Sequence, residues 1–95
     1  MTSFDIAHVR EQGQDMIIVP MRADFGHKAT DDQVLIERSL SAAARAAGLA
    51  GLVVTVWDAG FGRMAFRGPP QWHPFLASIS LHWVARNINR RVTVG

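Results

Sequence analysis

The chain has 95 residues, of which 48% are hydrophobic and 19% are charged, with a formal net charge of +2 and no cysteine. This mixture predicts one globular domain over residues 1–95, and the lack of cysteine excludes disulfides, thiol catalysis and cysteine metal sites. No apolar run approaches the roughly 20 residues of a membrane span and no signal peptide pattern is present, so we expect a cytoplasmic protein without membrane association.

The first two predicted elements form a hairpin. Residues 4–10 mix apolar and polar side chains, which predicts a half-buried edge strand. Residues 11–14 have the polar, glycine-bearing character of a hairpin loop. Residues 16–21 are apolar on both alternating faces, which suits an interior strand. Pro20 cannot donate a backbone hydrogen bond, so the pairing should weaken there.

A polar loop over residues 22–29 leads into a predicted helix. Thr30 and Gln33 have the spacing of a capping box, in which each side chain bonds the backbone amide of the other residue. The helix should run to about Ala47, and Gly48 is a natural stop. Its inner face is rich in alanine, so we expect it to lie close against a sheet.

The second half of the chain repeats this order. Residues 52–57 predict a second strand that is apolar on both faces, and residues 63–67 predict an alternating one. A helix over residues 74–87 and a short final strand over residues 91–94 complete the pattern. The sequence therefore predicts an α+β fold of ββα–ββα order with a candidate fifth, C-terminal strand. Its sheet should be mostly antiparallel, with the two helices packed on one face.

The helix over residues 74–87 carries two apolar stripes, about 140° apart by helical geometry. A helix that is apolar on two sides is either deeply buried or holds a partner. Two helices on one face would also leave the doubly apolar strands partly uncovered. A symmetric homodimer would bury this surface, whereas a sheet that curls over its own core is the alternative. The candidate interface residues are Trp72, Leu81, Trp83, Val84 and Ile88.

Trp72 belongs to a stretch, residues 68–75, that also holds Phe75, a histidine and three prolines. Such a stretch could present Trp72 to a partner, because tryptophan is enriched at interface hot spots and prolines lower the entropic cost of ordering. Alternatively, Trp72 or Phe75 packs beneath the start of the following helix. We favour this second interpretation.

The loop over residues 22–28 is a candidate anion site. Arg22, His27 and Lys28 could hold a phosphate or carboxylate together with backbone amides. The loop lacks the glycine–lysine–serine/threonine order of a P-loop, and Asp24 would oppose an anion. Most loops of this kind are simply solvated.

The charges are unevenly distributed along the chain. Residues 1–48 hold five basic and seven acidic groups, whereas residues 49–95 hold five arginines and one aspartate. The basic half could contact a phosphate backbone, or it could pair with the acidic half in the fold, which we favour. No signature of a known nucleic-acid-binding motif is present. The nucleic-acid candidates are Arg63, Arg67, Arg86, Arg90 and Arg91.

Signals for catalysis are weak. The four histidines lack the close spacing of a helical zinc site, and no serine lies in a nucleophile elbow. We predict no catalytic residue, metal site or cofactor. A non-catalytic, self-associating interaction module is the preferred function, with other protein partners also considered. A nucleic-acid binder and a small anion-binding protein or enzyme are the alternatives.

Overall fold

The computed structural model describes residues 2–94. They form a mixed, five-stranded sheet with helices, in which the strand order is β4-β3-β2-β1-β5. The strands are β1 (Thr2–Glu11), β2 (Gln14–Pro20), β3 (Leu52–Asp58), β4 (Met64–Arg67) and β5 (Arg90–Val94). The helices are α1 (Thr30–Ala46), α2 (His73–Ser78) and α3 (Leu81–Arg86), with short 3₁₀ helices η1 (Ala23–His27) and η2 (Pro70–Trp72).

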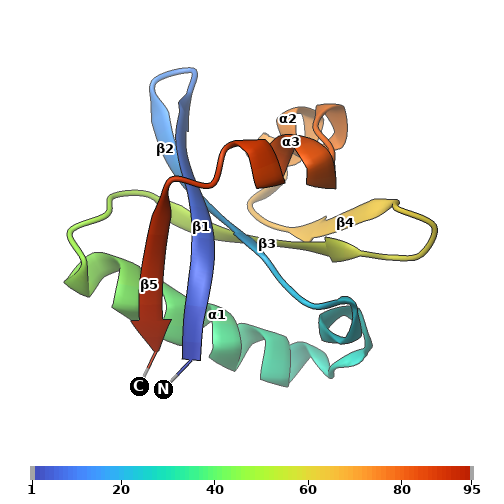
Figure 1. Cartoon of the computed structure of the whole chain (residues 1–95), viewed down its shortest axis with the longest axis horizontal. Coiled ribbons are helices and arrows are strands. Elements are labelled where there is room, and N and C mark those ends of the chain that lie inside the picture. The colour runs from blue at the N-terminus through green and yellow to red at the C-terminus, as the bar shows by residue number, and fades with distance from the viewer. Residues whose placement is uncertain (1, 95) are drawn as a thin grey trace.

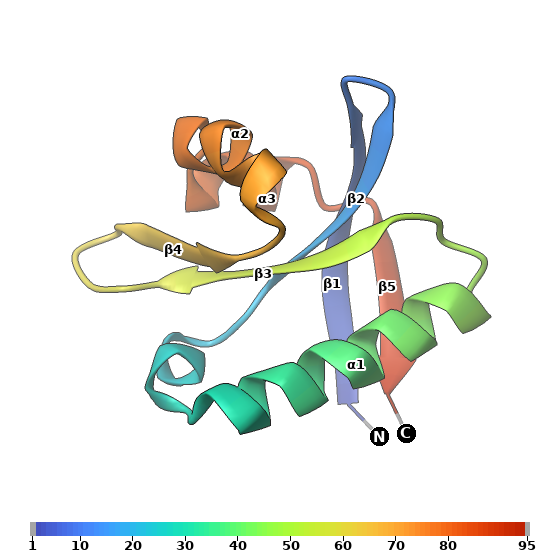
Figure 2. The ribbon, with the colours of Figure 1, turned by 180° about the vertical axis from the view of Figure 1, so that it is seen from behind.

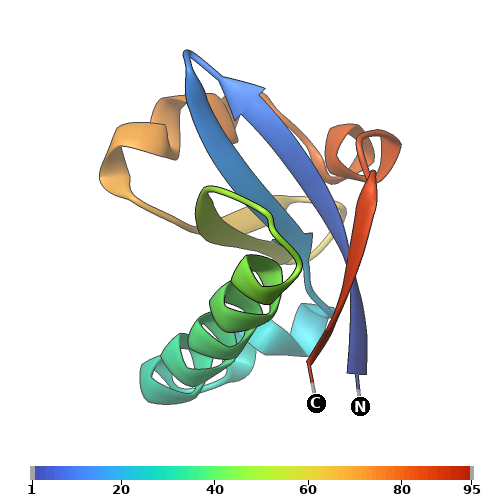
Figure 3. The ribbon, with the colours of Figure 1, turned by 90° about the vertical axis from the view of Figure 1, so that its left-hand side faces the viewer.

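The predicted α+β class, element order and fifth strand are confirmed, and the sheet is mostly antiparallel. The exception is the pair β2–β3, which is parallel because α1 carries the chain back across the sheet between them. β1 was expected at an edge, but β2 and β5 flank it. Figure 3 shows β5 alongside the N-terminal half of β1.

The helices do not share one face of the sheet, contrary to the expectation above. Ile17 and Val19 of β2 pack with Leu40 of α1, whereas Met16 and Ile18 pack with Leu76 and Val84 of α2 and α3. Adjacent residues of a strand point to opposite faces, so α1 covers one face and α2–α3 cover the other. Figures 1 and 2 show the two groups of helices well apart. The doubly apolar strands are therefore buried within one chain.

The predicted helix over residues 74–87 is two short helices. α2 ends at Ser78, and Ile79 is extended before α3 begins at Leu81. The Ser80 side chain accepts a hydrogen bond of 3.1 Å from the Trp83 amide, which satisfies one of the free donors at the start of α3. The break changes the direction of the chain, so apolar residues that lie on two sides of a continuous helix can enter one core.

The predicted capping box does not form. Thr30 is already helical, and Ala29 is the N-cap of α1 without a side-chain bond. Gln33 instead turns inward, where it is 7% exposed, and its Nε2 donates to the Phe25 carbonyl at 2.9 Å. Its side chain thus joins α1 to η1 rather than capping the helix. No helix within residues 2–94 is long and apolar enough to cross a membrane.

Candidate functional site

β1 pairs with a different neighbour in each of its halves. Residues 2–6 pair with β5, from Thr2↔Val94 to Ile6↔Arg90. Residues 7–11 pair with β2, from Ala7↔Ile18 to Glu11↔Gln14. The sheet is therefore split beside the N-terminal half of β1, where β1 and β2 diverge (Figure 1).

Pro20 and Met21 explain where the split begins. Continuing the register past Ala7↔Ile18 would place Pro20 opposite Asp5, but proline has no N–H to donate to that ladder. The end of β2 instead follows β3, since Pro20 pairs with Val56 and the Met21 amide donates to the Val56 carbonyl at 2.7 Å. The chain then turns into η1, away from β1.

At the split, the backbone N–H and C=O groups of alternate β1 residues point toward the gap. The Ile6 carbonyl accepts a hydrogen bond from the Asn89 backbone amide, and the His8 backbone bonds the Asn89 side chain. The backbone polar groups of these even-numbered residues therefore point toward the β5 side. Because backbone polar groups alternate in direction along a strand, those of Ser3 and Asp5 point toward the split. No backbone hydrogen bond joins Ser3 to residues 21–28 in the described part of the chain.

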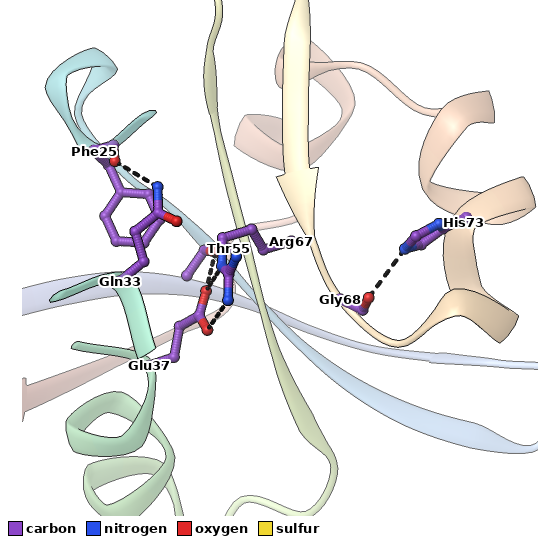
Figure 4. Close-up of polar contacts among 7 residues, drawn as sticks. All are labelled: Phe25, Gln33, Glu37, Thr55, Arg67, Gly68 and His73. Atoms are coloured by element: carbon purple, nitrogen blue, oxygen red, sulfur yellow. Dashed lines mark hydrogen bonds and ion pairs between the residues drawn. The ribbon is translucent and has the colours of Figure 1, made fainter. Parts of the chain in front are cut away.

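The far wall of the split is η1, and buried contacts hold it in place. Phe25 is 1% exposed, and its ring lies 5.3 Å from that of Trp57, centroid to centroid. The Gln33 amide binds the Phe25 carbonyl (Figure 4). Arg22 and Lys28 are the N-cap and C-cap residues of η1, so a fixed wall carries a cation at each end.

Between β1 and η1 lies an open cleft of about 500 Å³, which we call the split-sheet cleft. Such a volume is within the usual range of ligand sites. Its apolar lining is contributed by Phe4, Met21, Phe25 and Ile36, and its charged lining by Asp5, Arg22, Asp24 and Lys28. Asp5 is paired with Arg91 at 3.2 Å, whereas Arg22, Asp24 and Lys28 have no ion-pair partner among residues 2–94.

The predicted anion candidates are thus only partly brought together. Arg22 and Lys28 line the split-sheet cleft, but His27 does not, although it is exposed nearby on η1. Sequence reasoning found the loop but missed the other wall, because the open half of β1 depends on pairing between residues far apart in the chain. Pro20 was the local signal that pairing would weaken.

A second polar cluster is centred on Glu37 of α1 and includes residues of β3 and β4. Its Oε2 accepts hydrogen bonds from the Thr55 hydroxyl at 2.9 Å and from Arg67 Nε at 2.7 Å, while Oε1 accepts from Arg67 Nη2 at 3.3 Å. Figure 4 shows Thr55 and Arg67 converging on this carboxylate. Thr55 is fully buried, so the cluster satisfies a buried hydroxyl and ties α1 to β3 and β4.

A cleft of about 460 Å³ adjoins this cluster and includes His73 in its lining. His73 Nε2 lies 3.0 Å from the Gly68 carbonyl oxygen, and because a carbonyl only accepts, this nitrogen is the donor. Both oxygens of Glu37 are already engaged. We therefore interpret the cluster as a structural network that fixes the helix on the sheet.

The arginines proposed for nucleic-acid binding are spread over the molecule. Arg67 lies on β4 and Arg91 on β5, which are the two opposite edges of the sheet. Arg67 pairs with Glu37, and Arg91 pairs with Asp5. Both ion pairs join the basic second half of the chain to the acidic first half, as the favoured interpretation of the charges predicted.

The candidate interface residues divide by burial. Trp72 is 7% exposed and Val84 is fully buried, so a partner could reach neither without opening the core. Leu81, Trp83 and Ile88 are half-buried and pack against the same core. Of the two aromatic residues expected to pack beneath the helix, Trp72 is the buried one.

No group of three or more residues of metal-ligand type comes together within residues 2–94. The chain matches no protein-family model, no curated protein and no solved structure in the comparisons made. Its function has therefore to be argued from the geometry of the split-sheet cleft.

Proposed function

We propose that this protein is a non-catalytic interaction module that holds its partner in the split-sheet cleft. The observation that carries this proposal is the open half of β1, which faces a cleft with an apolar lining and two cations that have no ion-pair partner within residues 2–94. Apolar lining supplies affinity, and a few placed charges give orientation, which is the usual composition of a binding site. The fixed wall of η1 supports binding without a large rearrangement.

An anionic aromatic probe tests this proposal. Anilinonaphthalene sulfonate should bind to the folded protein, with its ring on the apolar lining and its sulfonate near Arg22 and Lys28. Arg22→Ala and Lys28→Ala should each weaken binding several-fold, since each removes a cation from the lining of the cleft. Arg38→Ala is the matched control, because Arg38 is exposed on α1 and does not line the cleft. Fluorescence titration that gives equal affinity for all four proteins would refute the proposal.

Self-association remains part of the proposal, now at a different surface. Leu35 of α1 is 59% exposed and lines an apolar groove of about 240 Å³ that also includes Phe4 and Val94. An exposed leucine beside an apolar groove is suited to an isologous contact between two copies.

Native mass spectrometry checks this part. We expect a dimer that persists at high salt, because the contact is apolar, and that dissociates in Leu35→Asp with the fold retained in circular dichroism. Leu52→Asp, at an equally exposed leucine away from this groove, should leave the dimer intact. A monomer at high protein concentration would exclude self-association and leave the cleft proposal standing.

A further inference from the structure

We infer that the partner in the split-sheet cleft is an extended, acidic peptide segment that adds to the open half of β1 as a strand. This inference rests on the proposed function, and it names the class of partner. A strand added to an open sheet edge gains affinity from backbone hydrogen bonds, and its alternate side chains give specificity.

The backbone geometry is the first argument. The polar groups of Ser3 and Asp5 point toward the cleft, while the other side of the same segment is held by β5. Pro20 prevents β2 from completing the ladder at this place. A ligand without its own backbone donors and acceptors would leave these strand groups to water, whereas an extended peptide pairs with them.

In the other half of β1, a side-chain amide makes the kind of backbone pairing that we infer for the peptide. Asn89 immediately precedes β5, and its side chain lies against His8. Its Oδ1 accepts from the His8 amide at 2.9 Å, and its Nδ2 donates to the His8 carbonyl at 2.9 Å. An amide group outside the ladder thus occupies an open position of β1, and a peptide backbone can make the same two bonds at Ser3.

The charges that line the split-sheet cleft determine the net charge expected of the peptide. Arg22 and Lys28 stand unpaired on the opposite wall within residues 2–94, against one unpaired carboxylate, that of Asp24. Asp5, on the β1 side of the cleft, forms an exposed ion pair with Arg91 at 3.2 Å. An acidic side chain on the added strand would therefore meet a net positive wall, while its apolar neighbours face Phe4 and Ile36.

Blocked pentapeptides that alternate valine and glutamate provide the test, followed by NMR on the uniformly ¹⁵N-labelled protein. We expect the amide of Ser3 to shift on titration, while the amide of His8, which Asn89 occupies, stays in place. Two further peptides carry N-methyl groups on alternate residues in opposite phases, one on the odd-numbered and the other on the even-numbered residues, so that each lacks the N–H donors of one side of the strand. The phase that removes the donors facing β1 should bind at least about tenfold more weakly than the other, because each lost hydrogen bond leaves its partner unsatisfied.

A variant of the protein tests the other side of the same bonds. Ser3→Pro removes the amide that faces the cleft and leaves the β1–β5 bonds of Thr2 and Phe4 intact, so the peptide should lose affinity while anilinonaphthalene sulfonate still binds. If this variant does not fold, the two N-methylated peptides still decide. Equal binding of both phases, or a valine–lysine peptide binding as well as the valine–glutamate one, would overturn the inference.

The outcomes separate the two proposals. Binding of the aromatic anion without any pentapeptide binding would overturn the peptide inference and keep the proposed function. Failure of both probes to bind at Arg22 and Lys28 would overturn the proposed function as well.

Discussion

At the scale of single residues, the Glu37 cluster joins elements that the sequence could not show to be neighbours. Glu37 lies 30 residues before Arg67 in the chain, and from the sequence Arg67 was only a candidate for phosphate contact. Their pairing at 2.7 Å depends on α1 packing against β3, the strand that pairs with β4. The capping box was wrong for a related reason, because the Gln33 side chain turns inward and donates to the Phe25 carbonyl instead of accepting from the Thr30 amide. Local spacing cannot rank such tertiary contacts.

The Glu37–Arg67 pair gives a stability prediction. Arg67→Ala should lower the free energy of unfolding by about 1–2 kcal/mol, since it leaves a part-buried carboxylate with one donor. Arg63→Ala, at an exposed position without an ion pair within residues 2–94, should change it by less than about 0.5 kcal/mol. Urea denaturation measures both. A double-mutant cycle with Glu37→Ala that shows no coupling would contradict this assignment.

At the scale of elements, the sequence predicted nearly every strand and the long helix, because their apolar patterns are regular. The region after residue 70 was harder. The two apolar stripes of residues 74–87 imply two covered faces only if these residues form one continuous helix. The chain bends at Ile79 and Ser80, so they do not. Serine favours helix caps and turns, but the apolar pattern of residues 74–87 continues across Ser80, so the pattern did not reveal the break.

Ser80 therefore has a specific role that can be tested. Ser80→Ala should destabilise the protein by about 1 kcal/mol, because the Trp83 amide loses its acceptor, whereas Ser80→Gly should cost only a few tenths. Ala77→Ser provides a control for the effect of a nearby exposed serine. Thermal unfolding followed by circular dichroism gives the comparison. Equal stability of Ser80→Ala and the parent chain would show that the cap contributes nothing.

At the scale of the whole molecule, β1 links two sets of strands. β2, β3 and β4 form one continuous set, whereas within residues 2–94 the only strand that pairs with β5 is β1, through its residues 2–6. Helices cover the central strands on both faces, whereas residues of the β1–β5 pair are covered mainly on the α1 side, by Leu40 and its neighbours. Regions with fewer buried contacts open at lower free energy than the centre of a core.

Hydrogen exchange should reveal this difference. We expect the amides of Phe4 and Val92 to exchange through an opening of lower free energy than those of Ile18 and Val54. The valine–glutamate peptide should slow the exchange of the first pair more than that of the second, because it would bind beside residues 2–6. Uniform protection across the four amides would show that the sheet opens as one unit.

The position of Trp57 also has an optical consequence. The chain has three tryptophans, and only Trp57 packs against Phe25, the buried residue of the η1 wall. Trp72 lies in the α2–α3 core, and Trp83 stacks edge-on with Phe75 at 5.7 Å. With the other two replaced by phenylalanine, the emission of the remaining indole would report on the wall of the split-sheet cleft. The molecule thus carries an intrinsic fluorophore one side chain behind the surface where we place its partner.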